Sequence, residues 1–329
     1  MADYKTIHGI SIRDYTTDPD TLITGQVWFD KTNNVLQFQA EGAGAWSTGG
    51  NLNVGGRYGS GLGTQTAGLY FGGLRHGLSG DRAETEAYNG TSWTEVADLN
   101  TARSTYGEGG VGISTAGACI AGKSPSSNEA KVENWNGSGW TETTDINTAR
   151  RQAACTGSQP ASMIFGGFTS TQVNQTEVWN GSSWTEVNDL NTTRDNMAAL
   201  GTTSAAFSCG GSPGPTAVTA IVESWNGTSW TETTDINIAR NGVGGSGSAT
   251  EGVIFAGRPP KSGHTERWNG TAWTEQNNLS RSISYVGNGT VSGTSTFVAG
   301  GDSDANPSAP AGTEEWNEPV LATKTADTD

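Results

Sequence analysis

Arginine recurs at nearly regular intervals along the chain, and its guanidinium group is suited to binding carboxylates and other anions. The positions are Arg57, Arg103, Arg150, Arg194, Arg240 and Arg281. Sixfold repetition indicates a structural role, such as an ion pair with the glutamate of a neighbouring Glu-x-Trp segment. A ring of arginines around a channel mouth, where it would capture an anion, is the alternative interpretation. A catalytic arginine set, as in sialidase-type enzymes, is a third.

Other reactive residue types do not form a recognisable pattern. The three histidines and three cysteines lie far apart, at His8, His76, His264, Cys119, Cys155 and Cys209. Neither a disulfide framework nor a zinc-binding Cys-x-x-Cys pair is present, and we expect the cysteines to be small buried residues. No Ser-His-Asp, P-loop or His-Glu-x-x-His pattern is apparent. The sequence therefore predicts a protein that is not an enzyme and has no cofactor or metal.

Charge and hydropathy limit the partners. The formal net charge of −15 argues against nucleic-acid binding, which requires clustered Lys and Arg. No run of 18 or more apolar residues is present, so we expect no membrane insertion. The first 20 residues also lack the apolar segment of a secretory signal.

A repeated phrase with two aromatic residues must determine the architecture. The first aromatic is Tyr88, Trp135, Trp179, Trp225, Trp268 and Trp316, at spacings of 47, 44, 46, 43 and 48. The second is Trp46, Trp93, Trp140, Trp184, Trp230 and Trp273. A Gly-Gly or Ala-Gly pair follows a short apolar run in every unit. Six units of four short strands, named a to d from the centre outwards, predict an all-β, six-bladed β-propeller.

The third unit illustrates the prediction. Its strands are expected near 151–157, 161–167, 175–179 and 183–187. Small residues on the first strand suit positions close to the axis, where the blades converge. The last two strands should form a hairpin around Asn180-Gly181, with a loop of two or four residues. A two-residue turn would need positive φ at both positions.

The repeated tryptophans have a structural explanation in such a fold. The hairpin register places Trp179 and Trp184 on one face of the sheet. Outer strands diverge, and we expect these large rings to fill the space between blades rather than to bind sugar. The Asn-Gly-Ser/Thr triplets match the glycosylation sequon, but we interpret them as turns. The aspartates of the repeated Asp-Leu/Ile-Asn segments, Asp98, Asp145, Asp189 and Asp235, are expected to bond within their own turns.

The two ends of the chain are expected to complete the fold. The last unit lacks a fourth strand after Trp316, whereas Trp46 belongs to a unit with no strands before it. The segment around Trp46 should therefore supply the outer strand of the last blade. We expect residues 1–40 to form an N-terminal arm with a β-hairpin, either closing the propeller or attaching to a neighbour, 41–317 to form the propeller, and 318–329 to form a flexible tail.

Several segments resemble known families. "DLNTARSTYG", with "IFGG" and "EVWNGSSW", resembles kelch-type repeats. "YKTIHGISI", "DPDTLITGQVWFDKTNNVLQF" and the "WNGTSWTE" units resemble structural proteins of marine tailed bacteriophages. This second resemblance covers nearly the whole chain. It implies a virion protein made in the bacterial host cytoplasm, present in multiple copies or as a homo-oligomer and in contact with other virion proteins.

The resemblance leaves three functions open. The first is a tail or fibre appendage that contacts host-surface glycan or protein, or virion neighbours. The second is a capsid decoration or adaptor subunit without a host ligand, and the third is a glycan-active enzyme. Binding is expected on the diverse b–c loops, which should share one face with the d–a loops. The candidate residues are Arg75, His76, Asp81, Arg82, Lys123, Arg258, Lys261, His264, Asp302 and Asp304.

Overall fold

A computed structural model describes residues 13–17, 19, 26–75, 80–125, 127–304, 311–318 and 321–326 of the 329-residue chain. All regular elements in these ranges are β-strands. The chain divides into two compact units. One contains Ala45–Asn317, and the other combines Met1–Gly44 with Glu318–Asp329.

The larger unit contains four-stranded antiparallel sheets, each built mostly from consecutive strands. The first contains β5 (Ser60–Thr64), β6 (Ala67–Phe71), β7 (Thr85–Tyr88) and β8 (Trp93–Val96). The second contains β9 (Gly110–Ile113), β10 (Ala116–Lys123), β11 (Asn128–Trp135) and β12 (Trp140–Glu142). The third contains β13 (Ala154–Ser158), β14 (Ala161–Phe165), β15 (Thr176–Trp179) and β16 (Trp184–Val187).

The remaining sheets of this unit follow the same order until the last. The fourth contains β17 (Ala198–Thr202), β18 (Ala205–Cys209), β19 (Val222–Trp225) and β20 (Trp230–Glu232). The fifth contains β21 (Gly244–Gly247), β22 (Gly252–Phe255), β23 (Thr265–Trp268) and β24 (Trp273–Glu275). The last contains β26 (Gly287–Asn288), β27 (Ser295–Ala299), β29 (Thr313–Asn317) and β4 (Ala45–Thr48), and β25 (Ile283–Ser284) pairs separately with β28 (Asp302–Ser303).

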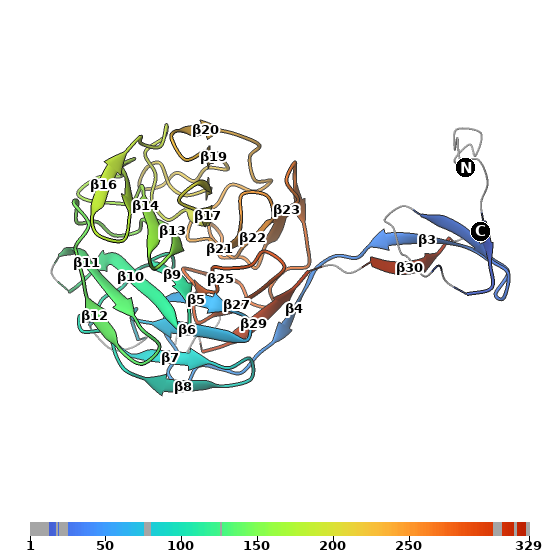
Figure 1. Cartoon of the computed structure of the whole chain (residues 1–329), viewed down its shortest axis with the longest axis horizontal. Coiled ribbons are helices and arrows are strands. Elements are labelled where there is room, and N and C mark those ends of the chain that lie inside the picture. The colour runs from blue at the N-terminus through green and yellow to red at the C-terminus, as the bar shows by residue number, and fades with distance from the viewer. Residues whose placement is uncertain are drawn as a thin grey trace. The chain divides into compact units, whose positions relative to one another are not determined.

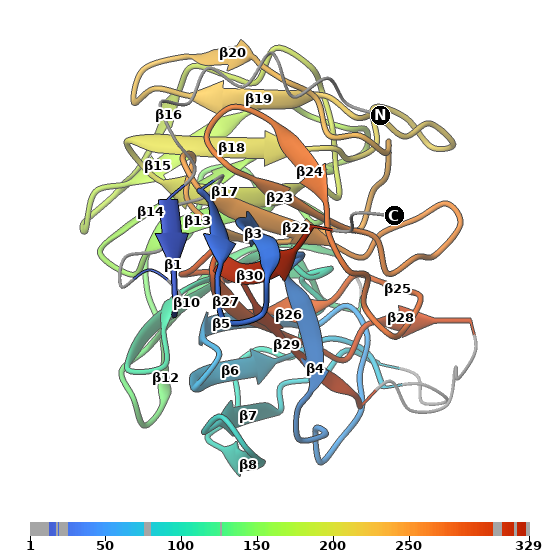
Figure 2. The same ribbon diagram turned by 90° about the vertical axis from the view of Figure 1, so that its right-hand side faces the viewer.

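The sheets are arranged around a centre. The first strands of successive sheets contact one another in the order β5, β9, β13, β17, β21, β26 and back to β5. Figure 1 shows β5, β9, β13 and β17 near the middle of this unit, and Figure 2 shows β18, β19 and β20 side by side towards its outside. The all-β architecture is consistent with a β-propeller.

Small residues allow the inner strands to approach one another. A Cβ atom added to Gly61 in β5 would lie 2.5 Å from the backbone nitrogen of Asn288 in β26. A Cβ atom on Gly110 in β9 would lie 2.2 Å from the carbonyl oxygen of Gly61. Ala154 in β13 is fully buried. The crowding near the centre therefore explains why small residues occupy these strands.

The predicted closure of the ring is confirmed. Strand β4 comes from the beginning of the unit and pairs antiparallel with β29 at its end. Trp46 lies opposite Trp316 in this pair. The outer edge of β29, which would otherwise present unpaired backbone groups, is covered by a strand from the other end of the unit.

The c–d hairpins have four-residue turns. In the third sheet, Trp179 pairs with Trp184, and their ring centroids are 5.6 Å apart, as the predicted shared face requires. Asn180 Oδ1 accepts hydrogen bonds from the backbone N–H groups of Ser182 and Ser183. Gly181 has φ of 94°, whereas Asn180 does not have positive φ. Of the two loop lengths left open by the sequence, the structure has the four-residue one, and the interpretation of Asn-Gly as a turn is confirmed.

Outer-strand tryptophans pack between adjacent sheets. Trp140 in the second sheet donates from Nε1 to Thr85 Oγ1 in the first, at 3.0 Å, and its ring lies 4.9 Å from that of Phe71. Trp230 makes the equivalent contacts with Thr176 and Phe165. The second aromatics are buried, apart from half-buried Trp46. Large rings therefore fill the space where the outer strands diverge.

The smaller unit is a four-stranded sheet from both ends of the chain. Its strands are β1 (Arg13–Tyr15), β2 (Val27–Asp30), β3 (Val35–Glu41) and β30 (Leu321–Thr325). The expected hairpin is present as β2 and β3, and Asp30 Oδ1 accepts from the Thr32 and Asn33 N–H groups in its turn. The expected flexible tail 318–329 differs from the structure, because Leu321–Thr325 pairs with β3. An open β3 edge accounts for this order.

Candidate functional site

The recurrent arginines form buried ion pairs. Arg103, Arg150, Arg194 and Arg240 are essentially inaccessible to solvent. Arg103 Nη2 lies 2.9 Å from Glu133 Oε1, Arg150 Nη2 lies 3.1 Å from Glu177 Oε1, and Arg194 Nη2 lies 2.9 Å from Glu223 Oε1. Arg240 pairs in the same way with Glu266. Each glutamate belongs to a Glu-x-Trp segment, so the pairing interpretation agrees with the structure at these four positions.

Each pair clamps the connection between two sheets. Glu223 also accepts hydrogen bonds from the Asn191 and Thr192 backbone N–H groups, in the connection from the third sheet to the fourth. The carbonyl of Arg194 accepts from Gly167 N–H in the third sheet. Burial lowers the pKa of Arg194, although Glu223 opposes this shift. Within such a pair the guanidinium group is not free to bind an exogenous anion.

Two repeats, those of Arg57 and Arg281, depart from this pattern. These two arginines do not occupy the position that the sequence predicts for them. The carbonyls of Gly56 and Ile283, not of Arg57 and Arg281, accept the inter-sheet bonds from Gly301 and Gly257. Buried Arg82 lies against Gly56, while Arg57 pairs with Asp302 at 3.3 Å.

Arg281 lies two residues before Ile283, whose carbonyl accepts the inter-sheet bond in this repeat. Its guanidinium group nevertheless pairs with the glutamate of a Glu-x-Trp segment. Its Nε lies 3.0 Å from Glu314 Oε1. Because the four buried arginines and Arg281 are engaged by glutamates, the structure does not contain the alternative six-membered axial ring.

The repeated aspartates have a different function from the one expected. Asp98 Oδ1 accepts from Thr85 N–H, Asp189 Oδ1 from Thr176 N–H, and Asp235 Oδ1 from Val222 N–H. These donors lie at the start of strand c of the same sheet rather than in the aspartate's own turn. The carboxylates therefore tie the segment after strand d to the neighbouring strand, which local turn propensity does not indicate.

The b–c and d–a connections meet at one face, which we call the loop face. Short β-bridges join Arg151 to Phe168, Asp195 to Ser212, and Asn241 to Arg258 across these connections. In each repeat, one backbone carbonyl of the d–a connection accepts the inter-sheet hydrogen bond. In most repeats the residue two positions later has positive φ, as do Gln152, Asn196 and Tyr285. Successive backbones are linked there, as Asn196 N–H donates to the Gln152 carbonyl at 2.8 Å.

Three tyrosines gather on the loop face. The ring centroids of Tyr58 and Tyr106 are 4.9 Å apart, and those of Tyr58 and Tyr285 are 5.0 Å apart. All three residues have positive φ, which is unusual for bulky side chains. Burial raises the pKa of all three hydroxyls, that of Tyr285 to about 12. The cluster forms an uncharged aromatic centre at neutral pH.

A groove lies beside this cluster, across the third, fourth and fifth sheets. It consists of two adjoining cavities with volumes of about 290 and 240 Å³, which share Pro215, Asn241 and Arg258. Its other polar side chains are Gln152, Gln172, Asp195, Asn196, Ser212 and Thr216. Phe168 and Pro259 contribute apolar walls. We call this the loop-face groove.

A carboxylate is held rigidly within the groove. Asp195 Oδ1 accepts from Asn196 Nδ2 at 2.8 Å, and its Oδ2 accepts from Gln172 Nε2 at 3.2 Å. Burial raises the pKa of Asp195, although the two amides and the charges of Arg151 and Arg258 act in the opposite direction. Asn196 is 7% exposed, and within the described chain its Oδ1 has no hydrogen-bond partner.

Two arginines flank the groove without a carboxylate partner among the described residues. Arg258 Nη2 donates to the Tyr285 hydroxyl at 2.6 Å, and its Nε donates to Asn241 Oδ1 at 3.3 Å. Arg151 lies over the Phe168 ring at 4.5 Å and donates to Asn128 Oδ1. Aromatic and amide contacts orient these guanidinium groups, and their charges act on the Asp195 carboxylate without a direct ion pair.

The predicted binding residues do not form one site. Arg258 lies in the groove, whereas Lys261 joins Asp302 at 2.9 Å and Asp304 at 2.7 Å in a separate ionic network. Arg82 and Asp302 are buried, which corrects their expected exposure. Exposed Arg75, Asp81 bonded to Ser104, half-buried Lys123 and half-buried His264 do not line the groove. His76 lies outside the described residues.

A buried carboxyl lies among the first strands of the sheets. Glu108, just before β9, accepts at Oε2 from Ala199 N–H in β17, at 3.4 Å. Because β13 lies between β9 and β17 in the ring, this side chain reaches across the centre. Burial raises the pKa of Glu108 well above its usual range, and Oε1 has no partner among the described residues.

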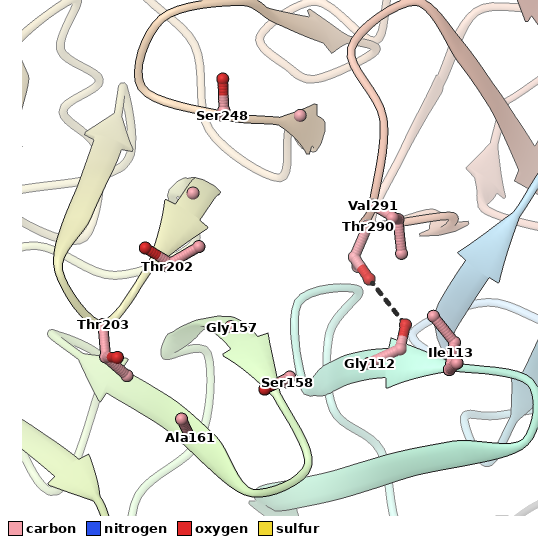
Figure 3. A pocket seen from close by; sticks show the side chains of 12 residues that line it. Gly112, Ile113, Gly157, Ser158, Ala161, Thr202, Thr203, Ser248, Thr290 and Val291 are labelled. Atoms are coloured by element: carbon pink, nitrogen blue, oxygen red, sulfur yellow. Dashed lines mark hydrogen bonds between the residues drawn. The ribbon is translucent and has the colours of Figure 1, made fainter.

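The a–b turns surround a second cavity, of about 290 Å³. Figure 3 shows Ser158, Thr202, Thr203 and Ser248 around it, and the hydrogen bond from Thr290 to the Gly112 carbonyl. Its lining is small, with exposed Ile113 and Val291 but without a charged side chain. It offers less chemical selectivity than the loop-face groove.

Sequence reasoning missed most groove residues. The missed residues lie on d–a connections, whereas binding was predicted on the b–c loops: Gln152, Asp195, Asn196 and Asn241. A usable signal was the variation immediately after the repeated arginines, in "RRQ", "RDN" and "RNG". Those positions vary between units although the arginine before them is repeated.

Comparison with known proteins gives no family assignment: no family model and no curated protein matches the chain. Within the described ranges, no group of three or more His, Cys, Asp or Glu residues is arranged to hold a metal ion. The described part of the chain also has no helix with the length and apolar character needed to cross a membrane.

Proposed function

We propose that this protein is a non-enzymatic binding component of a bacteriophage virion, built on a six-bladed, kelch-like β-propeller. The loop face would contact a host-surface glycan or protein, or a neighbouring virion protein. The observation that carries this proposal is the difference between the loop face and the c–d turns. The loop face has a charged groove with diverse side chains, whereas the c–d turns repeat one Asn-Gly geometry.

The separate terminal sheet supports an attachment role for the smaller unit. Both ends of the chain contribute strands to it, and its outer strands β1 and β30 present edges that another chain can extend. A tail or fibre appendage needs one part that attaches to the particle and another that makes contacts. The sequence resemblance to tailed-phage structural proteins supplies the virion setting of this proposal.

A catalytic role receives less support from the arginines. A sialidase-type site requires several arginines free to bind a substrate carboxylate. Here Arg103, Arg150, Arg194 and Arg240 are committed to buried glutamates. A decoration or adaptor subunit is the second candidate function, favoured by the same terminal strand edges.

Localisation and cell binding together test the proposal. The fluorescently labelled full chain is added to cells that the phage infects, and particle maps locate the chain in the virion. Cell binding and a tail or fibre position support the proposal. A capsid position without cell binding supports the decoration function instead. Release of sugar from the cell envelope would contradict the non-enzymatic role.

A further inference from the structure

The loop-face groove has the dimensions of a small-molecule site. Its two adjoining cavities, about 290 and 240 Å³, meet at Pro215, Asn241 and Arg258. Ligand-binding clefts are generally roughly 300–1,000 Å³. Each cavity is therefore of a size suited to one sugar ring of a ligand rather than to a large, flat protein surface.

The polar groups of the groove suit a polyhydroxylated ligand. Asn196, Gln152 and Asn241 present amides, which both donate and accept hydrogen bonds, and Asp195 adds an acceptor. Asn196 Oδ1 is an independent indication of a ligand, because a polar atom buried without a partner is disfavoured. A sugar hydroxyl would donate to this oxygen after a small shift of the side chains that cover it, because the oxygen itself is not accessible.

Charge determines the ligand class further. Arg258 uses Nε for Asn241 and one Nη2 hydrogen for Tyr285, which leaves N–H donors without a partner within the described chain. Arg151, which lies over the Phe168 ring of the groove wall, also lacks a carboxylate partner among those residues. A planar carboxylate matches the fork of a guanidinium group better than a neutral hydroxyl does.

We infer that the loop-face groove binds a carbohydrate that carries a carboxylate, with Arg258 contacting the carboxylate and Asp195 and Asn196 contacting hydroxyl groups. This inference deepens the proposed function and rests on it for biological meaning. It assigns a ligand class to the face already proposed to make contacts. Ligand charge and hydroxyl pattern would both contribute to selectivity.

Calorimetry on the full-length chain tests this inference. The probes are a galacturonic acid trisaccharide, its methyl ester, N-acetylneuraminic acid, neutral lactose, inorganic phosphate and inorganic sulfate. We expect binding of at least one carboxylated sugar, and at least tenfold weaker binding of the ester and of lactose. Failure of both carboxylated probes to bind, equal binding of lactose, or equally tight binding of phosphate or sulfate would overturn the inference.

Variants localise the binding. Arg258→Gln should weaken binding of the carboxylated sugar at least tenfold. Asn196→Gly should also weaken binding, and glycine is chosen because it tolerates the positive φ at this position. Lys131→Gln is the control. It removes one positive charge, as Arg258→Gln does, but from a partly exposed residue of strand β11 that does not line the groove.

Thermal melting verifies folding, and Arg151→Gln replaces Arg258→Gln if that variant is unfolded. Unchanged affinity in the folded groove variants would refute the site. Cell binding without sugar binding would refute this inference alone, whereas sugar binding without cell binding would refute only the proposed function.

Discussion

Trp46 and Trp316 lie opposite each other in the strand pair that closes the ring, with ring centroids 5.4 Å apart. Trp46 also donates from Nε1 to Thr265 Oγ1 in the preceding sheet, at 2.9 Å. The Trp46 side chain therefore connects the first strand of the larger unit to both the fifth and the last sheet. Closure depends on residues that are distant in sequence, so loss of either end should affect the whole unit.

Removal of residues 1–50 should unfold or aggregate the protein, because β29 would lose its outer partner and Trp316 its cover. Removal of residues 1–25 should leave the melting transition of the larger unit nearly unchanged, since β4 is retained. Circular dichroism melts of both variants check this expectation. An unchanged melting temperature after removal of residues 1–50 would show that β4 does not close the ring.

Trp184→Ala should lower the free energy of unfolding by about 3–5 kcal/mol, the usual effect of truncating a large buried aromatic. Its ring is 7% exposed and packs beside Trp179. Denaturant titration measures the change, and Thr185→Ala on the exposed side of the same strand is the control. A loss below about 1 kcal/mol would contradict a packing function for this tryptophan.

Arg194→Met should lower the free energy of unfolding by about 3–5 kcal/mol, because Glu223 would be left charged and buried. The double variant Arg194→Met with Glu223→Leu should be more stable than the single variant, since it removes both charges. Denaturant titrations of the single and double variants provide the comparison. Equal destabilisation in both would mean that the ion pair is not the source of the effect.

Glu108 should make the protein less stable as pH rises. Burial raises its pKa in the folded state above the ordinary value of 4.5. The folded state therefore retains the proton more strongly, and this stabilisation is complete below the unfolded pKa and is lost as pH rises towards the folded pKa. Glu108→Gln should weaken this dependence and raise the melting temperature at neutral pH. Parallel pH profiles for variant and wild type would contradict the expectation.

The repeating core was the predictable part of the fold. The spacing of Trp179 and Trp184 was sufficient to predict their shared face, and the unmatched Trp46 predicted the closing strand. Both predictions depend on local alternation and on the need to cover edges. β30 was missed because a short segment around polar Lys324 has little strand signal without its partner β3.

The groove was harder to predict because its parts come from three units. Asp195, Gln172 and Arg258 are separated in sequence, and only the converging connections bring them together. The sequence also does not show that buried Arg82 lies beside Gly56, where other repeats have the repeated arginine. Only the three-dimensional structure shows this. Repetition indicates which residues maintain the fold, whereas departures from it need a structure to locate them.

Binding of the intact chain to host cells, measured with substitutions on the loop face, tests whether this face is the contact surface. The double variant Arg151→Gln with Arg258→Gln is compared with Lys131→Gln and the wild type, after thermal melts establish that all are folded. We expect at least tenfold fewer bound molecules for the double variant and no change for Lys131→Gln. Wild-type levels of binding by the folded double variant would contradict the assignment of the loop face as the contact surface.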